Sequence, residues 1–263
     1  MPTPFQHLAY AELVVRHPDL PLSIQRRLLN AWGPFLLGST AGDVQVITAQ
    51  SRIETHFYNL ADIGIRSAVD TLLTAHPHLG SPQNLSPAHA AFVTGYLVHL
   101  VWDEVWARDL FIPLYQDAPH WQERAAYFLH HNALRVLLDR RAYAALQERA
   151  SLRSSLRAVV PHRWLPFAED GALLSWRDWL VQQLTNPAAI QTLMVFAQRM
   201  RVPVEELESL VRQMESSEYD SVPDWAAAVE RYEARALQET VETVVRYWGV
   251  EARVQLVKEH EAQ

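Results

Sequence analysis

The sequence predicts an all-α protein, on three observations. Apolar residues recur through most of the chain at the spacing of amphipathic helices. Alternating apolar and polar runs joined by turn pairs such as Asn-Gly, which would indicate hairpins, are nearly absent. Proline or a capping residue stands where several of the helical patterns begin. We therefore expect a multi-helix bundle.

The first part of the chain alternates helical patterns with turn-rich links. Helices are expected from residue 3 or 4 to about 16, from 21 to 32 and from 63 to 73. Gly33-Pro34 is interpreted as a break, and residues 35–43 as an apolar segment that runs into a Gly/Ser turn at Asp43. Residues 44–47 are expected to be extended and 51–59 to form a loop rich in polar side chains.

The second part continues with longer helical patterns. A central helix should begin after Ser86, a good N-cap followed by proline, and end near Phe111, before Pro113. Residues 216–221 are expected to form a loop. The other expected helices cover residues 121–147, 173–184, 188–200, 204–214 and 224 to about 248.

The central helix carries the first functional signal. It is apolar on most sides and is therefore expected to be buried. His99 and Asp103 interrupt it and, being four residues apart, share one face. A buried imidazole and carboxylate need compensation, which a metal ion or a mutual hydrogen bond can supply. The spacing alone leaves both explanations open.

Further candidate ligands lie upstream, each with a simpler explanation. His7 also fits a helix-surface histidine, Asp43 a turn or cap residue, and His56 a hydrogen-bonded loop residue. Because the chain has no cysteine, a metal would be held by His, Asp, Glu or backbone oxygen, which suits zinc, manganese or iron. The zincin, di-iron bundle, nucleophile-elbow and P-loop motifs are all missing.

The order of these segments resembles the zinc-dependent phospholipase C family, an all-helical family that includes single-strand zinc nucleases. The segments run P-T-P-F-Q-H-L-A, F-L-L-G-S-T-A-G-D, E-T-H-F-Y-N and G-Y-L-V-H-L-V-W-D-E-V-W. They follow the family order His, Asp, His and then H-x-x-x-D on one helix. The resemblance covers about residues 2–112 and extends at most to residue 145.

The resemblance implies a metal site made of Asp43, His56, His99 and Asp103, with His7 in a neighbouring site that Asp103 bridges. In place of an expected histidine stands Asp109, and the H-x-x-x-E motif that should follow is not found. His131, slightly preferred over His130, is the substitute that the chain offers. One to three zinc ions are expected, with manganese or iron as alternatives.

The implied reaction is the hydrolysis of a phosphoester by metal-bound hydroxide, because a bound metal lowers the pKa of water toward ~7. Asp43 is the catalytic candidate: besides ligating the metal, it would assist the water. The substrate is expected to be a phosphoester small molecule or a phospholipid. The aromatic residues around the site can either line an apolar approach or pack the core.

Composition limits the alternatives. The net charge of −7 and the lack of a Lys/Arg cluster disfavour long nucleic acids as partners. The N-terminus does not have the pattern of a secretory signal and no apolar run is long enough to span a membrane, so a cytoplasmic protein is expected.

Histidine is absent between His162 and His260. We therefore expect a metal-binding core over residues 1–150 and a helical extension over 151–263, which could mediate homo-oligomerisation; one continuous domain is the alternative. Two other functions stay open. One is a non-catalytic protein with a single structural or vestigial metal, and the other is a nuclease or nucleotidase that uses the same metal site.

Overall fold

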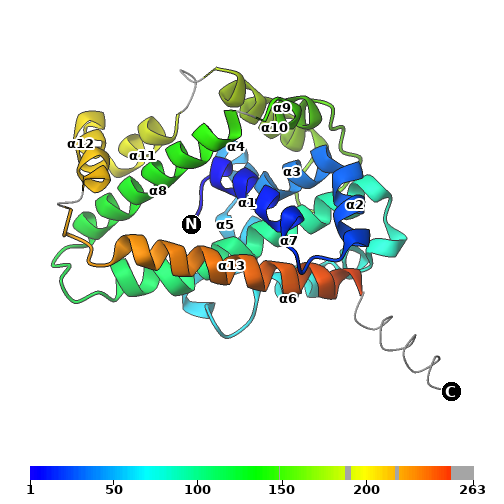
Figure 1. Cartoon of the computed structure of the whole chain (residues 1–263), viewed down its shortest axis with the longest axis horizontal. Helices are drawn as coiled ribbons and strands as arrows, with labels where there is room; N and C mark the ends of the chain where they lie inside the picture. Colours follow the sequence, from blue (N-terminus) through cyan, green and yellow to red (C-terminus); the bar gives the residue numbers. More distant parts are fainter. Residues whose placement is uncertain (148, 187–190, 217–218, 250–263) are drawn as a thin grey trace.

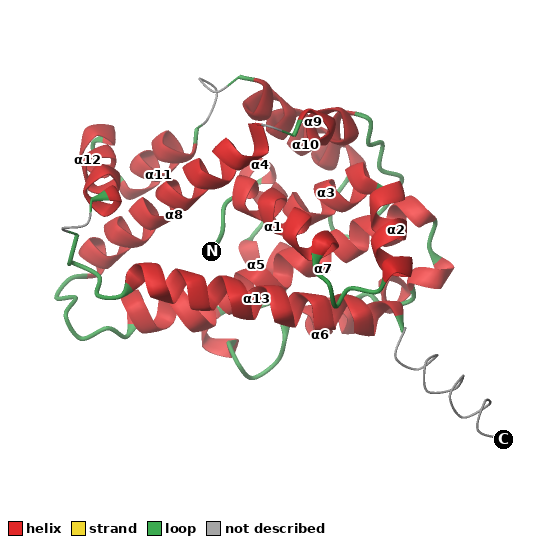
Figure 2. Cartoon of the chain, viewed as in Figure 1, coloured by secondary structure: helices red, strands yellow, loops and turns green. Residues whose placement is uncertain are grey.

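The computed structural model describes residues 1–147, 149–186, 191–216 and 219–249 of the 263-residue chain. Over these residues every regular element is a helix and no strand occurs, which confirms the all-α prediction (Figure 2). In the same residues no helix is long and apolar enough to cross a membrane.

The first three helices are α1 (Pro4–Arg16), α2 (Leu22–Asn30) and α3 (Trp32–Ala41). At the start of α1 the side chain of Gln6 accepts a hydrogen bond from the Thr3 N–H, which satisfies a donor that has no partner within the helix. The break expected at Gly33-Pro34 lies slightly earlier, at Ala31 between α2 and α3. Proline is tolerated in a first helical turn, and here α3 begins just before it.

The Gly/Ser turn predicted before Asp43 is wrong, because α3 continues through it to Ala41. The glycines have a packing role. A Cβ on Gly38 would lie 2.0 Å from the backbone oxygen of Phe92, and a Cβ on Gly95 would lie 2.1 Å from that of Phe35. These glycines let α3 lie directly against α7 (Pro87–Trp106), which carries His99 and Asp103.

Short helices fill the segment between α3 and α7. They include η1 (Gly42–Val44), α4 (Gln45–Thr48) and α5 (Arg52–His56). The structure is therefore helical where an extended segment was expected at 44–47, and helical over the first half of the loop expected at 51–59. The helix α5 begins with a capping box, in which the Glu54 side chain accepts a hydrogen bond from the Ser51 N–H at 2.9 Å. The remaining short elements are η2 (Leu60–Asp62), α6 (Ala68–Ala75), η3 (Pro77–Gly80) and η4 (Pro82–Asn84).

The central helix α7 begins as predicted, with the Ser86 side chain accepting from the His89 N–H. It does not stop near Phe111. A wider helical segment, η5 (Ala107–Gln116), continues from it in the π-helical pattern and contains Pro113. Such π-helical turns are rare and are often found at functional sites.

The remaining helices are α8 (Arg124–Gln147), α9 (Ala150–Arg157), α10 (Asp170–Thr185), α11 (Thr192–Met200), α12 (Val204–Glu215) and α13 (Trp225–Trp248). The helix α9 was not predicted. The expected start of α11 at residue 188 and part of the expected loop at 216–221 lie outside the described residues.

Helices from both halves of the chain share one apolar core. In Figure 1, α1 lies between α8 and α13, and α13 also packs against α7. Buried apolar side chains from Phe5 to Tyr247 form a single cluster. The division into residues 1–150 and 151–263 stays a prediction.

Candidate metal centre

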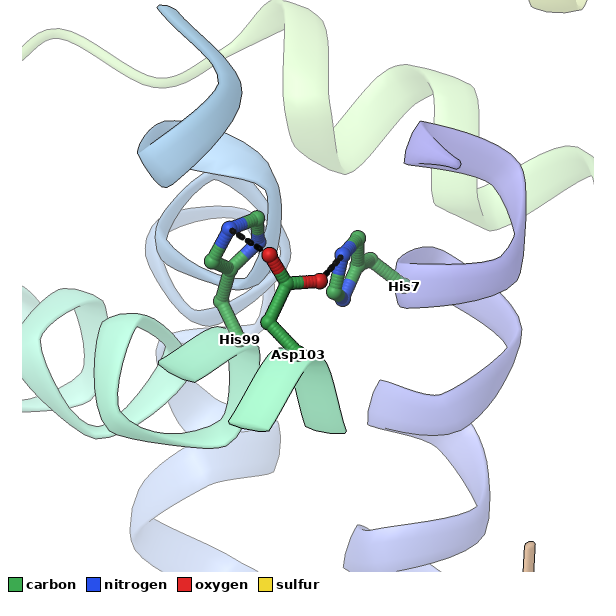
Figure 3. A group of neighbouring side chains, drawn as sticks. All are labelled: His7, His99 and Asp103. Atoms are coloured by element: carbon green, nitrogen blue, oxygen red, sulfur yellow. Dashed lines mark ion pairs between the residues drawn. The ribbon is translucent and has the colours of Figure 1, made fainter. Parts of the chain in front are cut away.

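Three residues that the sequence singled out meet in the buried space between α1 and α7. The Asp103 carboxylate lies beside the rings of His7 and His99, which stack on each other with their centroids 4.0 Å apart (Figure 3). Its Oδ1 is 3.3 Å from Nε2 of His7, and its Oδ2 is 3.9 Å from Nε2 of His99. All three side chains are essentially inaccessible to solvent, so they depend on one another or on a bound ion for compensation.

Several polar atoms in this group lack a hydrogen-bond partner. Neither ring nitrogen of His7 has one among the described residues, and the same holds for Oδ1 of Asp103. The short distance between His7 and Asp103 therefore reflects proximity without the geometry of a hydrogen bond. Buried polar groups are almost always satisfied in proteins, so these atoms need a partner, which an ion or a water molecule could supply.

His56, at the end of α5, faces His99 across the same space. Their Nε2 atoms lie 3.1 Å apart, and Nε2 of His56 is also 3.2 Å from Oδ2 of Asp103. Nδ1 of His99 lies 3.0 Å from the Ser39 carbonyl, which can only accept, so this nitrogen carries the proton. The Nε2 atom of neutral His99 therefore presents a lone pair to His56.

The tautomer of His56 depends on two oxygens near its Nδ1. The Thr55 hydroxyl lies at 2.9 Å and the Arg52 carbonyl at 3.3 Å. If Nδ1 donates to either oxygen, the Nε2 atoms of His56 and His99 point two lone pairs at each other, an arrangement that a cation between them would stabilise. If Nδ1 instead accepts from Thr55, the proton on His56 Nε2 can be donated to His99 or Asp103 without a metal.

Asp43 brings a second carboxylate to this side of the cluster. It follows α3 in the 3-10 turn η1, and its Oδ1 lies 3.7 Å from Nε2 of His56. Potential ligand atoms of Asp43, His56 and His99 all lie within 4.8 Å of one another, as do those of His7, His99 and Asp103. Tetrahedral ligands about 2.05 Å from a zinc ion are themselves separated by about 3.3 Å, so the inner distances fit such an ion.

Arg52 is the main feature of this site that sequence analysis missed. Its Nη2 donates to Asp103 Oδ2 at 2.6 Å and to the Tyr58 hydroxyl at 2.8 Å. Its position four residues before His56 on the same short helix places both side chains on one face, and this spacing was the available signal. A guanidinium therefore already neutralises one edge of the buried carboxylate.

The surroundings fix the charge states of the cluster. Burial alone would raise the pKa of Asp103, but Arg52 and the three nearby imidazoles outweigh it and hold that pKa well below its usual range. Burial, reinforced by His7, lowers the pKa of His99 well below its usual value. Burial and then Arg52 lower the pKa of His56. Ionised carboxylates and neutral imidazoles are the forms that bind metals, so these side chains could hold a metal ion.

Two predicted ligands lie elsewhere. Asp109, on η5, receives a hydrogen bond from Arg108 Nε at 2.8 Å and lies 3.4 Å from Arg235. Nε2 of His131, on α8, accepts from the indole N–H of Trp106 at 3.0 Å. Neither belongs to the two described groups: arginines compensate the charge of Asp109, and Trp106 donates to Nε2 of His131. Metal ligation by these two residues stays a prediction.

No protein-family model matches the chain, and neither a curated protein nor a solved structure matches it. The class of protein is therefore defined by the fold and the site alone. It is an all-α protein whose buried His/Asp cluster could hold a metal ion.

Proposed function

We propose that the protein is a metal-dependent hydrolase of phosphoesters, of the type that the resemblance to zinc-dependent phospholipases C implies. The facing Nε2 atoms of His56 and His99, 3.1 Å apart and beside the ionised Asp103, are the observation that supports this most strongly. Unpartnered polar atoms on His7 and Asp103 support it further.

The donor set fits one ion held by Asp43, His56, His99 and Asp103. Because Nδ1 of His99 is committed to Ser39, this histidine offers a single lone pair and cannot ligate two ions. His7 faces the opposite oxygen of Asp103 and is placed for a second ion that the carboxylate would bridge. A divalent ion bound here would polarise a phosphoryl oxygen and lower the pKa of a coordinated water.

The chain's own residues supply the other parts of the reaction. Asp43 has 14% of its side chain exposed and can accept the proton of the attacking water at the solvent edge of the cluster. The side chain of Arg52 is 31% exposed and presents a guanidinium to that edge. Arginine binds phosphoryl oxygens in a planar, two-pronged manner, so Arg52 would bind and orient the phosphate of the substrate.

Elemental analysis of the purified protein, combined with a panel of phosphodiesters and phosphomonoesters, tests this function. At least one zinc, manganese or iron ion per chain is expected, together with metal-dependent hydrolysis of at least one ester. Asp103→Asn should abolish both, since it removes the carboxylate that meets His7, His56 and Arg52. Hydrolysis that survives this change undiminished would refute the assigned site.

A second candidate is a non-catalytic protein with a single structural metal. The ion pair of Arg52 with Asp103 favours it, because the guanidinium already binds Oδ2 of this carboxylate and so limits how many ions the carboxylate can meet. The engagement of Asp109 and His131 with other partners favours it as well. One bound ion per chain, a lower melting temperature after chelation and no hydrolysis across the whole panel would select this function.

A further inference from the structure

A cavity of about 750 Å³ lies between α8, α11 and α12, away from the residues of the His/Asp cluster. These three helices pack against one another at one end of the molecule (Figure 1). Its volume falls within the range of small-molecule sites. The lining is largely apolar and includes Phe128, Leu129, Phe196, Met200 and Val202.

Arg135 is the unusual residue of this lining. Its Nε donates to the Met1 carbonyl at 2.6 Å and its Nη1 to the Asn132 side chain at 2.9 Å. The guanidinium lies 4.2 Å from the ring centroid of Phe196. Nη2 has no acceptor and no carboxylate lies within ion-pair distance among the described residues.

A partly buried arginine usually has an acidic partner, because removing its charge from water is costly. Burial lowers the pKa of Arg135 to about 10, so the side chain still carries its charge near neutral pH. The cavity therefore contains a positive charge that has hydrogen-bonding capacity left over and, among the described residues, no carboxylate in direct contact; Asp43 and Asp103 act on it only from a distance.

The other charges of the lining limit the charge of a suitable ligand. Arg124 and Arg199 lie at the exposed rim, and so do Glu123 and Glu206. The rim charges balance, which leaves Arg135 as the one partly buried charge of the lining, with no carboxylate in direct contact among the described residues. A monoanion matches this balance, whereas a dianionic phosphate would bring one negative charge too many into an apolar site.

We propose that this cavity binds an apolar monocarboxylate, with the carboxylate on Arg135 and the hydrocarbon part against the apolar lining. Arginine pairs with a planar carboxylate through parallel N–H donors, and Nη2 is available for this pairing. Phe196 holds the guanidinium from one face, and the apolar side chains contribute through burial of the hydrocarbon. The lining shares no residue with the His/Asp cluster, so binding here can be tested separately from the function proposed there.

Calorimetric titration of the full chain with dodecanoate below its micellar concentration tests the proposal. Dodecanol and dodecyltrimethylammonium are the neutral and cationic comparators, and dodecyl phosphate is the dianionic one. Dodecanoate should bind at least about tenfold more tightly than each of them. Equal affinity for dodecanol, or tighter binding of dodecyl phosphate, would overturn the proposal.

Two variants locate the binding. Ala125→Glu places a carboxylate on an exposed residue that lines the cavity, and it should weaken dodecanoate binding at least about tenfold. Ala144→Glu makes the same change at an exposed position of α8 outside the described lining and should leave the affinity unchanged within about twofold. Dodecanoate that binds Ala125→Glu as tightly as the native chain would place the ligand elsewhere.

Arg135→Gln removes the charge itself and should eliminate the preference for dodecanoate over dodecanol. Because Arg135 also bonds to Met1 and Asn132, its circular dichroism and melting curve must first establish that the variant is folded. A folded Arg135→Gln that still prefers dodecanoate would overturn the proposal. If the variant does not fold, the comparison of Ala125→Glu with Ala144→Glu decides the matter.

Discussion

The pKa values of two buried carboxylates in this protein are shifted in opposite directions. Asp103 on α7 and Asp139 on α8 are each only 1% exposed. The pKa of Asp103 lies well below its usual range because Arg52 and nearby imidazoles outweigh the effect of burial. Burial raises the pKa of Asp139 to about 6, since its partners are hydroxyl groups that compensate the negative charge only in part.

The hydrogen bonds around Asp139 support a protonated form. Thr192 donates to its Oδ2 at 2.6 Å, while the Thr3 hydroxyl lies within hydrogen-bond distance of both Asp139 Oδ1 and Gln6 Oε1. A hydroxyl has one hydrogen to donate. Both contacts of Thr3 are satisfied if Asp139 is protonated and donates to Thr3, which in turn donates to Gln6.

The difference teaches that burial of an acid does not by itself indicate a metal. Asp139 is surrounded by groups that can satisfy a neutral carboxyl, and it connects the start of α1 to α8 and α11. Asp103 is kept ionised among imidazoles, some of whose nitrogens have no partner. The second environment is the one that a cation could complete.

Chelation should produce the largest change. A metal at about one hundred times its dissociation constant stabilises the folded state by about 3 kcal/mol, so its removal should lower the melting temperature by roughly 6–12 °C. Asp139→Asn should keep this response to EDTA, and Asp103→Asn should lose it. Identical melting curves with and without EDTA in the native protein would contradict the metal assignment.

The second-largest effect is expected in the pH dependence of stability, to which the raised pKa of Asp139 should contribute. The folded state retains the proton of Asp139 up to about pH 6, whereas the unfolded chain releases it near pH 4. Stability from this group is therefore fully present below about pH 4 and is lost as pH rises to about 6, with a total of about 2–3 kcal/mol. Urea unfolding at several pH values should show this difference between the native protein and Asp139→Asn. Parallel curves would contradict it.

A change at Gly42 should test whether the position of His99 matters for metal binding. A Cβ there would lie 2.3 Å from Nε2 of His99, so Gly42→Ala must displace that ring. We expect metal affinity to fall about tenfold, as for other changes that misorient a ligand. Gly171→Ala has open space around its Cβ and is the matched control, which should bind metal normally. Unchanged affinity in Gly42→Ala would remove His99 from the site.

The smallest effect is expected at Asp109. Its contacts are the partly exposed Arg108 and the exposed Arg235, and ion pairs of this kind contribute at most about 1 kcal/mol. Asp109→Asn should therefore change stability by less than about 1 kcal/mol and leave metal content unchanged. Loss of bound metal from Asp109→Asn, measured by elemental analysis, would instead show that Asp109 is a ligand.

The sequence predicted the long helices well, because their apolar spacing and caps are local properties. Pro87 after Ser86 marked the start of α7, and the pattern of residues 121–147 marked most of α8. Short elements such as α5 were missed, since five residues are too few to show a helical period. Continuation of α3 through Gly38 depends on how closely α7 approaches, which local sequence does not reveal.

The sequence by itself determined the all-α class and the candidates His7, Asp43, His56, His99 and Asp103. Helical periodicity and the spacing of His99 and Asp103 on one helix face follow from the chain itself. The other three candidates were supported by their order along the chain, which resembles that of the zinc-dependent phospholipase C family. Only the tertiary structure decided that these residues meet, that Arg52 joins them, and that Asp109 and His131 have other partners. Partners distant in sequence are brought together by packing, so the satisfied and unsatisfied acids could be told apart only in the folded protein.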